Sequence, residues 1–516
     1  MNLAQVLAQS AARDPEKVAI DFEGIQYTYK QLDEGIRRCA YFLKKIGVEK
    51  GDRIAIQLPK CIEFVYLHLA TQSIGAITLP LNVGYPASEI HYFLTDSQSS
   101  VFVTYKEGYQ AVKDVLSSIQ GLKVLLLDDE SIDGYSALTE ELKKVPDKDV
   151  RTYPTEADDV GVLLYTSGTT GKPKGAMITH RNLISNMKAL HQVWRWSDKD
   201  VLLHALPLFH AHGLSVALHG GLYAGATIVM HRKFDPKRTW ETLESVPCTV
   251  FMGVPTMYYR LMREWDSVKP DLSKMRVFIS GSAPLLENLF YKFEEATGFR
   301  ILERYGMTEA LMITSNPYEP ERRIPKSVGY PLPGVRIRVV SDEGKDVEPG
   351  TVGEVWIKGV NVFKGYWNNP EKTKETFCDG WLKSGDLGYQ DPEDDLRLYL
   401  VGRAKELIIT GGYNVYPKEV ENVLEEHEAV LEAAVVGIPD EDFGEKVTAA
   451  VVLKENMKEI EPDEIIRYCK GKLASYKCPK MVFKLESLPR NAMGKIQKHI
   501  LQRDLTEKVK KGAVES

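Results

Sequence analysis

The chain has 516 residues, a length that predicts more than one domain with large hydrophobic cores. Apolar residues make up 43% and charged residues 27%, and the net charge of −6 comes from 72 acidic and 66 basic residues without long runs of one sign. This composition is typical of a soluble globular protein and argues against nucleic-acid binding.

The sequence also lacks the marks of membrane insertion and of secretion. No stretch approaches the roughly 18 consecutive apolar residues of a transmembrane helix. The N-terminus is expected to form a short amphipathic helix that ends near Asp14 and Pro15, not a signal peptide. The six cysteines show neither CxxC pairs nor a metal-binding spacing, which indicates reduced thiols and a cytoplasmic protein.

Helix and strand signals alternate through the first third of the chain. Apolar residues at helical spacing predict a helix over 28–47, followed by a glycine turn and a strand. Such βα repetition predicts a mostly parallel sheet covered by helices. The further elements expected here are a helix over 62–73 and strands near 53–58, 76–81, 101–104 and 124–127.

A loop rich in glycine, hydroxyl and lysine residues, YTSGTTGKPKG, spans residues 165–175 directly after an apolar run. Glycines let backbone N–H groups turn inward and form an anion nest, and Lys174 adds a mobile positive charge. The loop differs from a Walker motif, because Pro173 follows Lys172 and no Gly-x4-Gly-Lys-Ser/Thr is present. A strand, not a helix N-terminus, is expected after it. The pattern favours a polyphosphate site over a plain polar hairpin.

Two further motifs, SGSAP at 280–284 and ERYGMTE at 303–309, each follow a strand-like run. We therefore expect them in loops at the carboxyl ends of parallel strands, where open α/β sheets bind ligands. Tyr305 could offer a flat face to a purine, and Glu309 could hold Mg²⁺, although such a residue alone is more often a solvated helix cap. A tight turn is expected at 384–386, with Asp386 as its carboxylate.

The pattern changes after residue 335. Short strands punctuated by glycine up to about residue 400 predict a small β-rich subdomain. A break is expected at 402–403. Beyond it lies an α+β segment with helices over 417–427 and 462–473 and strands over 431–436 and 446–453. The predicted fold class is α/β, with a large N-terminal domain of helix-covered, mostly parallel sheets over residues 1–402 and a small, mobile α+β domain over 403–516.

Together these motifs resemble those of the adenylate-forming enzymes, which include acyl-CoA synthetases, luciferases and the adenylation domains of peptide synthetases. The likeness extends from about Thr28 to Lys498. It implies a ligase that uses ATP and Mg²⁺ to convert a carboxylic acid to an acyl-adenylate, from which the thiolate of CoA displaces AMP. The expected partners are a small carboxylic acid, ATP and CoA, and the expected assembly is a monomer or a homodimer.

The resemblance also implies roles for single residues. The catalytic residues would be Lys495, Thr308, Glu309 and His210, with Lys495 on a mobile loop that reaches the carboxylate and the α-phosphate. Lys405 matches the hinge, and Gly411 and Gly412 match the passage for the pantetheine of CoA. Thr166 and Glu309 would hold the metal. The implied ATP site comprises Thr166, Ser167, Gly168, Thr169, Thr170, Gly171, Lys174, Ser282, Ala283, Glu303, Arg304, Tyr305, Gly306, Met307, Thr308, Asp386 and Arg403.

The acid that is activated depends on the acyl pocket, expected to include His210, Val254, Thr256, Arg260 and Met312. Thr256 and Arg260 lie four residues apart on one face of an expected helix. If it projects into the pocket, Arg260 can bind a second carboxylate in bidentate fashion; the alternative is that it reaches solvent.

The segments GVPTMYYR and ERYGMTEALMITSNP resemble the malonyl-CoA synthetase branch, which implies malonate or methylmalonate. Residues 311–313 are more apolar than is common there. Medium- or long-chain fatty acids and a carrier-protein acceptor stay open as alternatives, as do a luciferase-like oxygenase and a non-catalytic nucleotide-binding protein.

Overall fold

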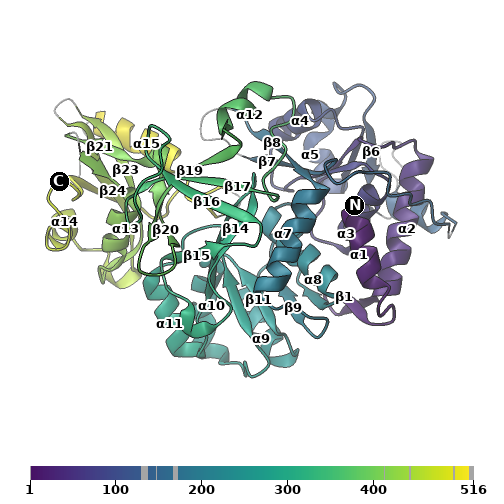
Figure 1. The fold of residues 1–516 in the computed structure, drawn as a ribbon, viewed down its shortest axis with the longest axis horizontal. Helices are drawn as coiled ribbons and strands as arrows, with labels where there is room; N and C mark the ends of the chain where they lie inside the picture. The colour runs from purple at the N-terminus through teal and green to yellow at the C-terminus, as the bar shows by residue number, and fades with distance from the viewer. Residues whose placement is uncertain are drawn as a thin grey trace.

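The computed structural model describes residues 2–128, 137–146, 148–166, 172–411, 413–440, 443–491 and 494–510. These residues form three sheets with helices packed around them (Figure 1). Within this part of the chain, no helix combines the length and the apolar character needed to cross a bilayer. All six cysteines are free thiols, five of them buried, as the sequence predicts.

The first sheet has the strand order β6-β5-β3-β4-β7-β8, and its neighbours pair in parallel except for the antiparallel hairpin β7–β8. The predicted alternation of helices and strands is therefore confirmed. Its strands are β3 (Arg53–Ile56), β4 (Ile77–Pro80), β5 (Val101–Thr104), β6 (Lys123–Leu126), β7 (Val160–Thr166) and β8 (Lys174–Thr179), and the connecting helices include α2 (Tyr29–Lys45), α3 (Ile62–Ser73), α4 (Ala87–Asp96) and α5 (Lys106–Leu116).

The second sheet is parallel at its centre and antiparallel toward the C-terminal side. Strands β9, β10, β11 and β12 pair in parallel, and β9, β11 and β12 end at His204, Gly253 and Ser280. The elements are β9 (Val201–His204), β10 (Thr227–Met230), β11 (Val250–Gly253), β12 (Val277–Ser280), β13 (Leu302–Met307) and β14 (Leu311–Ser315), with helices α7 (His180–Val193), α8 (His219–Ala224), α9 (Pro236–Ser245), α10 (Pro255–Val268) and α11 (Glu287–Thr297).

The β-rich region expected after residue 335 is present and is continuous with the second sheet. Its strands are β15 (Ser327–Pro331), β16 (Val335–Val340), β17 (Gly353–Gly359), β19 (Trp381–Asp391) and β20 (Arg397–Arg403).

One local prediction in this region was wrong, because residues 384–386 lie within β19 and not in a tight turn. The break expected at residues 402–403 coincides with the end of β20. Gly385 adopts a φ value of +70°, so β19 bends at glycine without ending.

The C-terminal segment has a sheet and a hydrophobic core of its own. It lies beside the β-rich strands at one end of the molecule (Figure 1). Its elements are β21 (Ile408–Thr410), β22 (Tyr413–Val415), β23 (Val430–Asp440), β24 (Gly444–Leu453), β25 (Met481–Lys484), α13 (Pro417–Glu425), α14 (Pro462–Lys470) and α15 (Lys498–Lys510). The helices and strands predicted after residue 417 are thus confirmed to within a few residues, and the proposed division after residue 402 falls between two separate cores.

A π-helix, η1 (His212–Leu218), lies between β9 and α8. Its start is packed so closely that a Cβ atom on Gly213 would lie 2.0 Å from the carbonyl oxygen of Pro207, so only glycine fits there. π-helical turns are rare and occur frequently at functional sites, because they redirect side chains within an otherwise regular helix.

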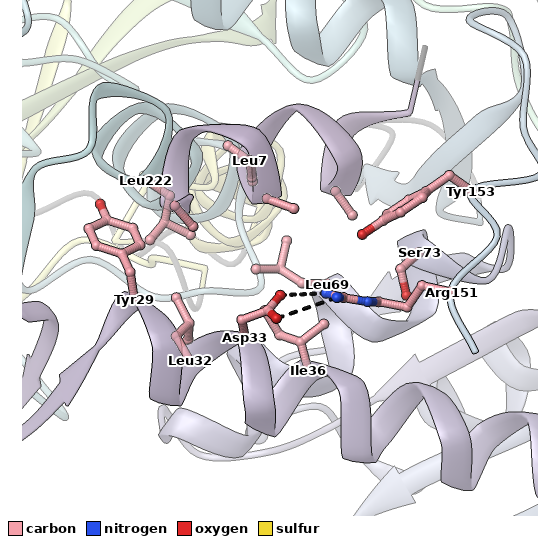
Figure 2. A pocket seen from close by; sticks show the side chains of 13 residues that line it. Leu7, Tyr29, Leu32, Asp33, Ile36, Leu69, Ser73, Arg151, Tyr153 and Leu222 are labelled. Carbon is pink, nitrogen blue, oxygen red and sulfur yellow. Dashed lines mark hydrogen bonds and ion pairs between the residues drawn. The ribbon is translucent and has the colours of Figure 1, made fainter. Parts of the chain in front are cut away.

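A small cavity lies between α1 (Leu3–Ala11), α2 and α3, far along the chain from the sequence motifs (Figure 2). Its volume of about 20 Å³ leaves room for roughly one water molecule. The Arg151 guanidinium at its wall is already bound to the carboxylates of Asp33 and Asp149. This cavity is therefore a packing feature of the N-terminal helices.

Two buried histidines link α3 to α8. Nε2 of His68 lies 2.8 Å from Nε2 of His219, and the two rings are stacked. Burial lowers the pKa of His68 to about 3, so the folded pair stays neutral at physiological pH. The contact ties the end of the π-helical segment to the first sheet.

We expect this histidine pair to make stability depend on pH. Folding lowers the pKa of His68 from its ordinary value of 6.5. Below pH 6.5 the unfolded chain therefore binds more protons than the folded protein, and the free energy of unfolding falls as the pH decreases. The His68→Gln variant should lose about 1 kcal/mol less per pH unit than the wild type between pH 6 and 5. Urea unfolding at both pH values measures this difference. Equal losses in both proteins would contradict the assignment.

Candidate active site

The glycine-rich loop connects the two strands of an antiparallel hairpin. Thr166, the last residue of β7, pairs with Lys174, the first residue of β8, and the strand predicted after the loop is confirmed. Nζ of Lys174 lies 5.3 Å from the ring centre of Tyr366. Ser167, Gly168, Thr169, Thr170 and Gly171 lie outside the described residues.

Glu309 lies next to this lysine. Its carboxylate is buried and accepts a hydrogen bond of 2.8 Å from the hydroxyl of Tyr366, the residue over which Lys174 is placed. Burial and the nearby Lys372 lower the pKa of Lys174, and the Glu309 carboxylate opposes that shift. A hydroxyl, a cation and a carboxylate thus gather at the base of the hairpin.

The ligand atoms around Glu309 determine which metal ion this part of the site could bind. Among the described residues no three His, Cys, Asp or Glu side chains are clustered so that they could bind a metal ion by themselves. Mg²⁺ is usually bound by one or two carboxylates together with phosphate oxygens and water. The single carboxylate of Glu309, near Lys174 at the base of the hairpin that Thr166 closes, fits such a shared site.

The SGSAP segment forms a loop directly after β12, as predicted. Ser282 has φ of +71°, and the side chains of Ser282 and Ala283 are exposed. The buried Glu303 anchors the end of this loop, because its carboxylate accepts a 2.9 Å hydrogen bond from the backbone N–H of Leu285. Burial raises the pKa of Glu303 to about 8.

Residues 303–307 form strand β13, so the prediction of a loop there was wrong. The strand turns at Thr308 into an antiparallel hairpin with β14. A Cβ atom on Gly306 would lie 2.2 Å from the carbonyl oxygen of Leu311, which shows how closely the two strands approach. The bulge between Tyr305 and Gly306 shifts the register, and Met312 is buried against this glycine.

Tyr305 is connected to the β-rich strands through Asp386. The phenol of Tyr305 donates a hydrogen bond to one carboxylate oxygen of Asp386, and Nε of Arg403 lies 2.8 Å from the other. Asp386 and Arg403 face each other in the β19–β20 pairing. The predicted adenine and ribose residues thus form one hydrogen-bonded group.

The C-terminal loop that carries Lys495 reaches this group. A Cβ atom on Gly494 would lie 3.8 Å from Oγ1 of Thr256, which places the loop against the start of α10. Lys495 is exposed to solvent, and desolvation by the surrounding groups together with the Arg403 charge lowers its pKa. Burial and the Arg403 charge also lower the pKa of Lys405 to about 8, with a smaller contribution from Lys495.

A cavity of about 120 Å³ lies between η1 and the start of α10. Of the residues predicted for the acyl pocket, His210 and Val254 line it, whereas Thr256, Arg260 and Met312 are not among its lining residues. Arg260 is exposed on α10, which is the alternative that the sequence leaves open. The wall consists of Leu206, Pro207, His210, His212, Gly213, Val254, Met257 and Ser282.

The two histidines of this cavity are neutral. Burial, and the positive charge of Arg304, lower the pKa of His210 to about 4 and hold that of His212 well below its usual range. Nδ1 of His212 lies 3.3 Å from the hydroxyl of Ser282. Nδ1 of His210 and Nε2 of His212 have no hydrogen-bond partner within the described part of the chain.

Arg304 is the charged residue behind these histidines. It is 2% exposed, and its guanidinium lies against Gly281, where a Cβ atom would come within 2.3 Å of Cζ. Its Nε and Nη2 have no partner among the residues described. Burial lowers its pKa to about 9, so the group remains charged at neutral pH. The sequence places Arg304 in the ATP site and gives no sign of this orientation.

Comparison with known proteins agrees with this arrangement. Residues 7–367 match the family model described as AMP-binding enzyme, and residues 419–495 match the AMP-binding enzyme C-terminal domain. The crystal structure of ATP-bound MatB from Rhodopseudomonas palustris shares 41% identity and a TM-score of 0.92, covering 98% of this chain and 99% of that chain.

Two curated relatives cover nearly the whole chain. The malonate–CoA ligase of Arabidopsis thaliana is 34% identical over 548 residues, which span 98% of this chain and 89% of that protein. The long-chain-fatty-acid–CoA ligase of Bacillus subtilis is 34% identical over 535 residues, or 98% and 95% of the two proteins. With the nucleotide-site motifs gathered as described, the chain belongs to the family of AMP-binding enzymes and is an AMP-forming acid–CoA ligase.

Proposed function

We propose that this ligase activates a short dicarboxylic acid of the malonate or methylmalonate type. The observation that carries the proposal is the buried guanidinium of Arg304, which lies behind the histidines of the cavity at η1 and is not itself one of the lining residues. Its Nε and Nη2 nitrogens lack a partner in the described structure. A buried, unpaired donor on a charged group is costly unless a ligand satisfies it. A second carboxylate would satisfy it, because carboxylate oxygens match the guanidinium fork.

The neighbouring groups support the same acid class. His210 and His212 are neutral and offer ring N–H donors without adding charge, while Ser282 adds a hydroxyl. A fatty acyl chain in this place would leave the guanidinium unsatisfied. The relatives include both a malonate–CoA ligase and a long-chain-fatty-acid–CoA ligase, so the pocket chemistry decides between them.

The proposed nucleotide site lies among the hairpin β7–β8 and the strands β13, β19 and β20. The loop after β7 and Lys174 would hold the β- and γ-phosphates, and Glu309 and Thr166 would hold Mg²⁺, which would neutralise phosphate charge. Tyr305 lies against adenine, and Asp386 accepts hydrogen bonds from the ribose hydroxyls while Arg403 holds its other oxygen. The remaining residues of this site are Ser282, Ala283, Glu303, Gly306, Met307 and Thr308.

The proposed chemistry needs a cation where the acid meets the α-phosphate. Lys495 lies beside Arg403 and Asp386 and can donate to both reactants as negative charge develops on the phosphate oxygens. Lys405 is the hinge about which the small domain turns. The turn withdraws Lys495 and brings the hairpin at Gly411, with the undescribed Gly412, to the active site for attack by the CoA thiolate.

The Arg304→Met variant tests the dicarboxylate pocket. Methionine keeps the apolar stem and removes the donors, so we expect kcat/KM for malonate to fall by about 100-fold, from the loss of a charged hydrogen-bond pair. The readout is pyrophosphate release with ATP, Mg²⁺ and CoA, across malonate, methylmalonate, acetate, octanoate and palmitate. Arg260→Met is the matched control, since Arg260 lies on the exposed face of α10.

Two outcomes would contradict the dicarboxylate assignment. One is wild-type turnover of octanoate or palmitate well above malonate. The other is malonate activity that collapses in Arg260→Met and survives in Arg304→Met, which would move the second carboxylate to the α10 arginine. Turnover of acetate by Arg304→Met shows that the variant is still folded and binds ATP.

A further inference from the structure

Lys60, between β3 and α3, is a buried cation that the proposed reaction does not use. It is 8% exposed, and within the described residues it makes no ion pair. Burial lowers its pKa to about 7, and the more distant Glu23 opposes the shift. Burying an ammonium group without a carboxylate is unfavourable. The hydrogen bonds that Lys60 makes therefore indicate its role.

Within the described part of the chain, the hydrogen bonds of Lys60 both go to His204. Its Nζ lies 3.2 Å from Nδ1 of His204 and 3.3 Å from the carbonyl oxygen of the same residue. The other ring nitrogen, Nε2, lies 2.9 Å from the carbonyl oxygen of Gly213. A carbonyl can only accept, so Nε2 carries the proton and Nδ1 accepts from the lysine. Lys60 thereby fixes the tautomer that binds Gly213.

Gly213 is the point where this chain of hydrogen bonds reaches the cavity. It lies at the start of η1, is pressed against the carbonyl of Pro207, and both residues line the cavity together with His210 and His212. Release of its carbonyl from His204 would free the first turn of η1 to move. His212 is the first residue of this turn, and His210 lies two residues before it.

We infer that Lys60 is a positioning residue for the acyl pocket, acting through His204 on the first turn of η1. The inference rests on the proposed assignment of this cavity as the acyl pocket. It does not depend on which acid is bound there, because the contacts fix the shape of the wall and touch no substrate group.

The test compares Lys60→Met, which keeps the length and removes the donor, with Lys60→Gln, which keeps an N–H donor. For the acid that the wild type turns over best, we expect KM to rise about tenfold in Lys60→Met, with kcat and the KM for ATP within about twofold. Lys60→Gln should restore part of the loss. His204→Gln should give the same phenotype, and the double variant should add little to it, since both changes break one path.

Arg151→Met is the matched control, because Arg151 is another largely buried cation of the large domain and lies by the cavity of Figure 2, away from η1. It should lower the melting temperature and leave the KM for the acid unchanged. If Lys60→Met behaves in the same way, Lys60 only supports the fold and the inference is overturned.

Equal increases in the KM values for acid and ATP would also overturn it. If Lys60→Met does not fold, Lys60→Gln and His204→Gln decide by the same ratio of KM values. The measurement uses whichever acid is preferred, so failure of the dicarboxylate proposal would appear in the acid series and not here.

Discussion

The Lys495→Ala variant is expected to form acyl-adenylate about 10²–10³ times more slowly than the wild type. Lys495 lies beside Asp386 and Arg403 on a loop that packs against Thr256, between the proposed ribose site and the acyl pocket. Its ammonium group would stabilise charge that develops in the transition state, where removal of one preorganised donor costs about 3–4 kcal/mol. Pyrophosphate exchange measures this step directly.

The second half-reaction separates this role from general damage. Because Lys495 acts only before the small domain turns, thioester formation from supplied acyl-adenylate and CoA should stay within about threefold of the wild type. Lys484→Ala, a change on β25 in the same domain, should affect neither step. Equal loss in both half-reactions would exclude the assigned role.

The Glu309→Gln variant is expected to lose activity by a similar factor, about 10², through weakened metal binding. Glutamine retains an oxygen that can accept the hydrogen bond from Tyr366, so the local fold should be kept while the negative charge is lost. A carboxylate is the protein ligand that Mg²⁺ prefers, and an amide oxygen is a poorer substitute. Pyrophosphate release measured against Mg²⁺ concentration should show a midpoint shifted to higher concentration.

Tyr366→Phe is the control for Glu309→Gln, because it removes the hydrogen bond and leaves the carboxylate. It should change the Mg²⁺ dependence far less. An unchanged Mg²⁺ midpoint in Glu309→Gln would refute the metal assignment, since the loss of activity would then come from another step.

The order of helices and strands could be predicted because it depends on local periodicity. Helices α2 and α3 and strands β5 and β24 begin and end within a few residues of the predicted bounds. The errors at residues 303–307 and 384–386 are of one kind. A loop or turn was expected in each, whereas pairing with the next strand along the chain keeps the segment extended, with a bulge in the pairing.

The site was less accessible to sequence reasoning for a different reason. The family resemblance implies that Lys174, Glu309, Tyr305 and Asp386 share one site, and the structure places them in two groups of interacting side chains. Helical spacing could predict that Thr256 and Arg260 lie on one face of a helix. It could not predict whether that face contacts the acyl pocket or the solvent. Arg304 is buried because Gly281 leaves space for its guanidinium, a contact between segments that no local pattern reveals.

The π-helix at His212–Leu218 has a consequence for how the acid preference of such an enzyme can change. A π-helical turn contains one residue more than the α-helical turn that would span the same distance. Deletion of a single codon in this segment would therefore turn the preceding side chains by about 100° around the helix axis, without disturbing β9 or α8. One mutational event would thereby change the side chains that line the cavity at η1, a short evolutionary path from one substrate to another.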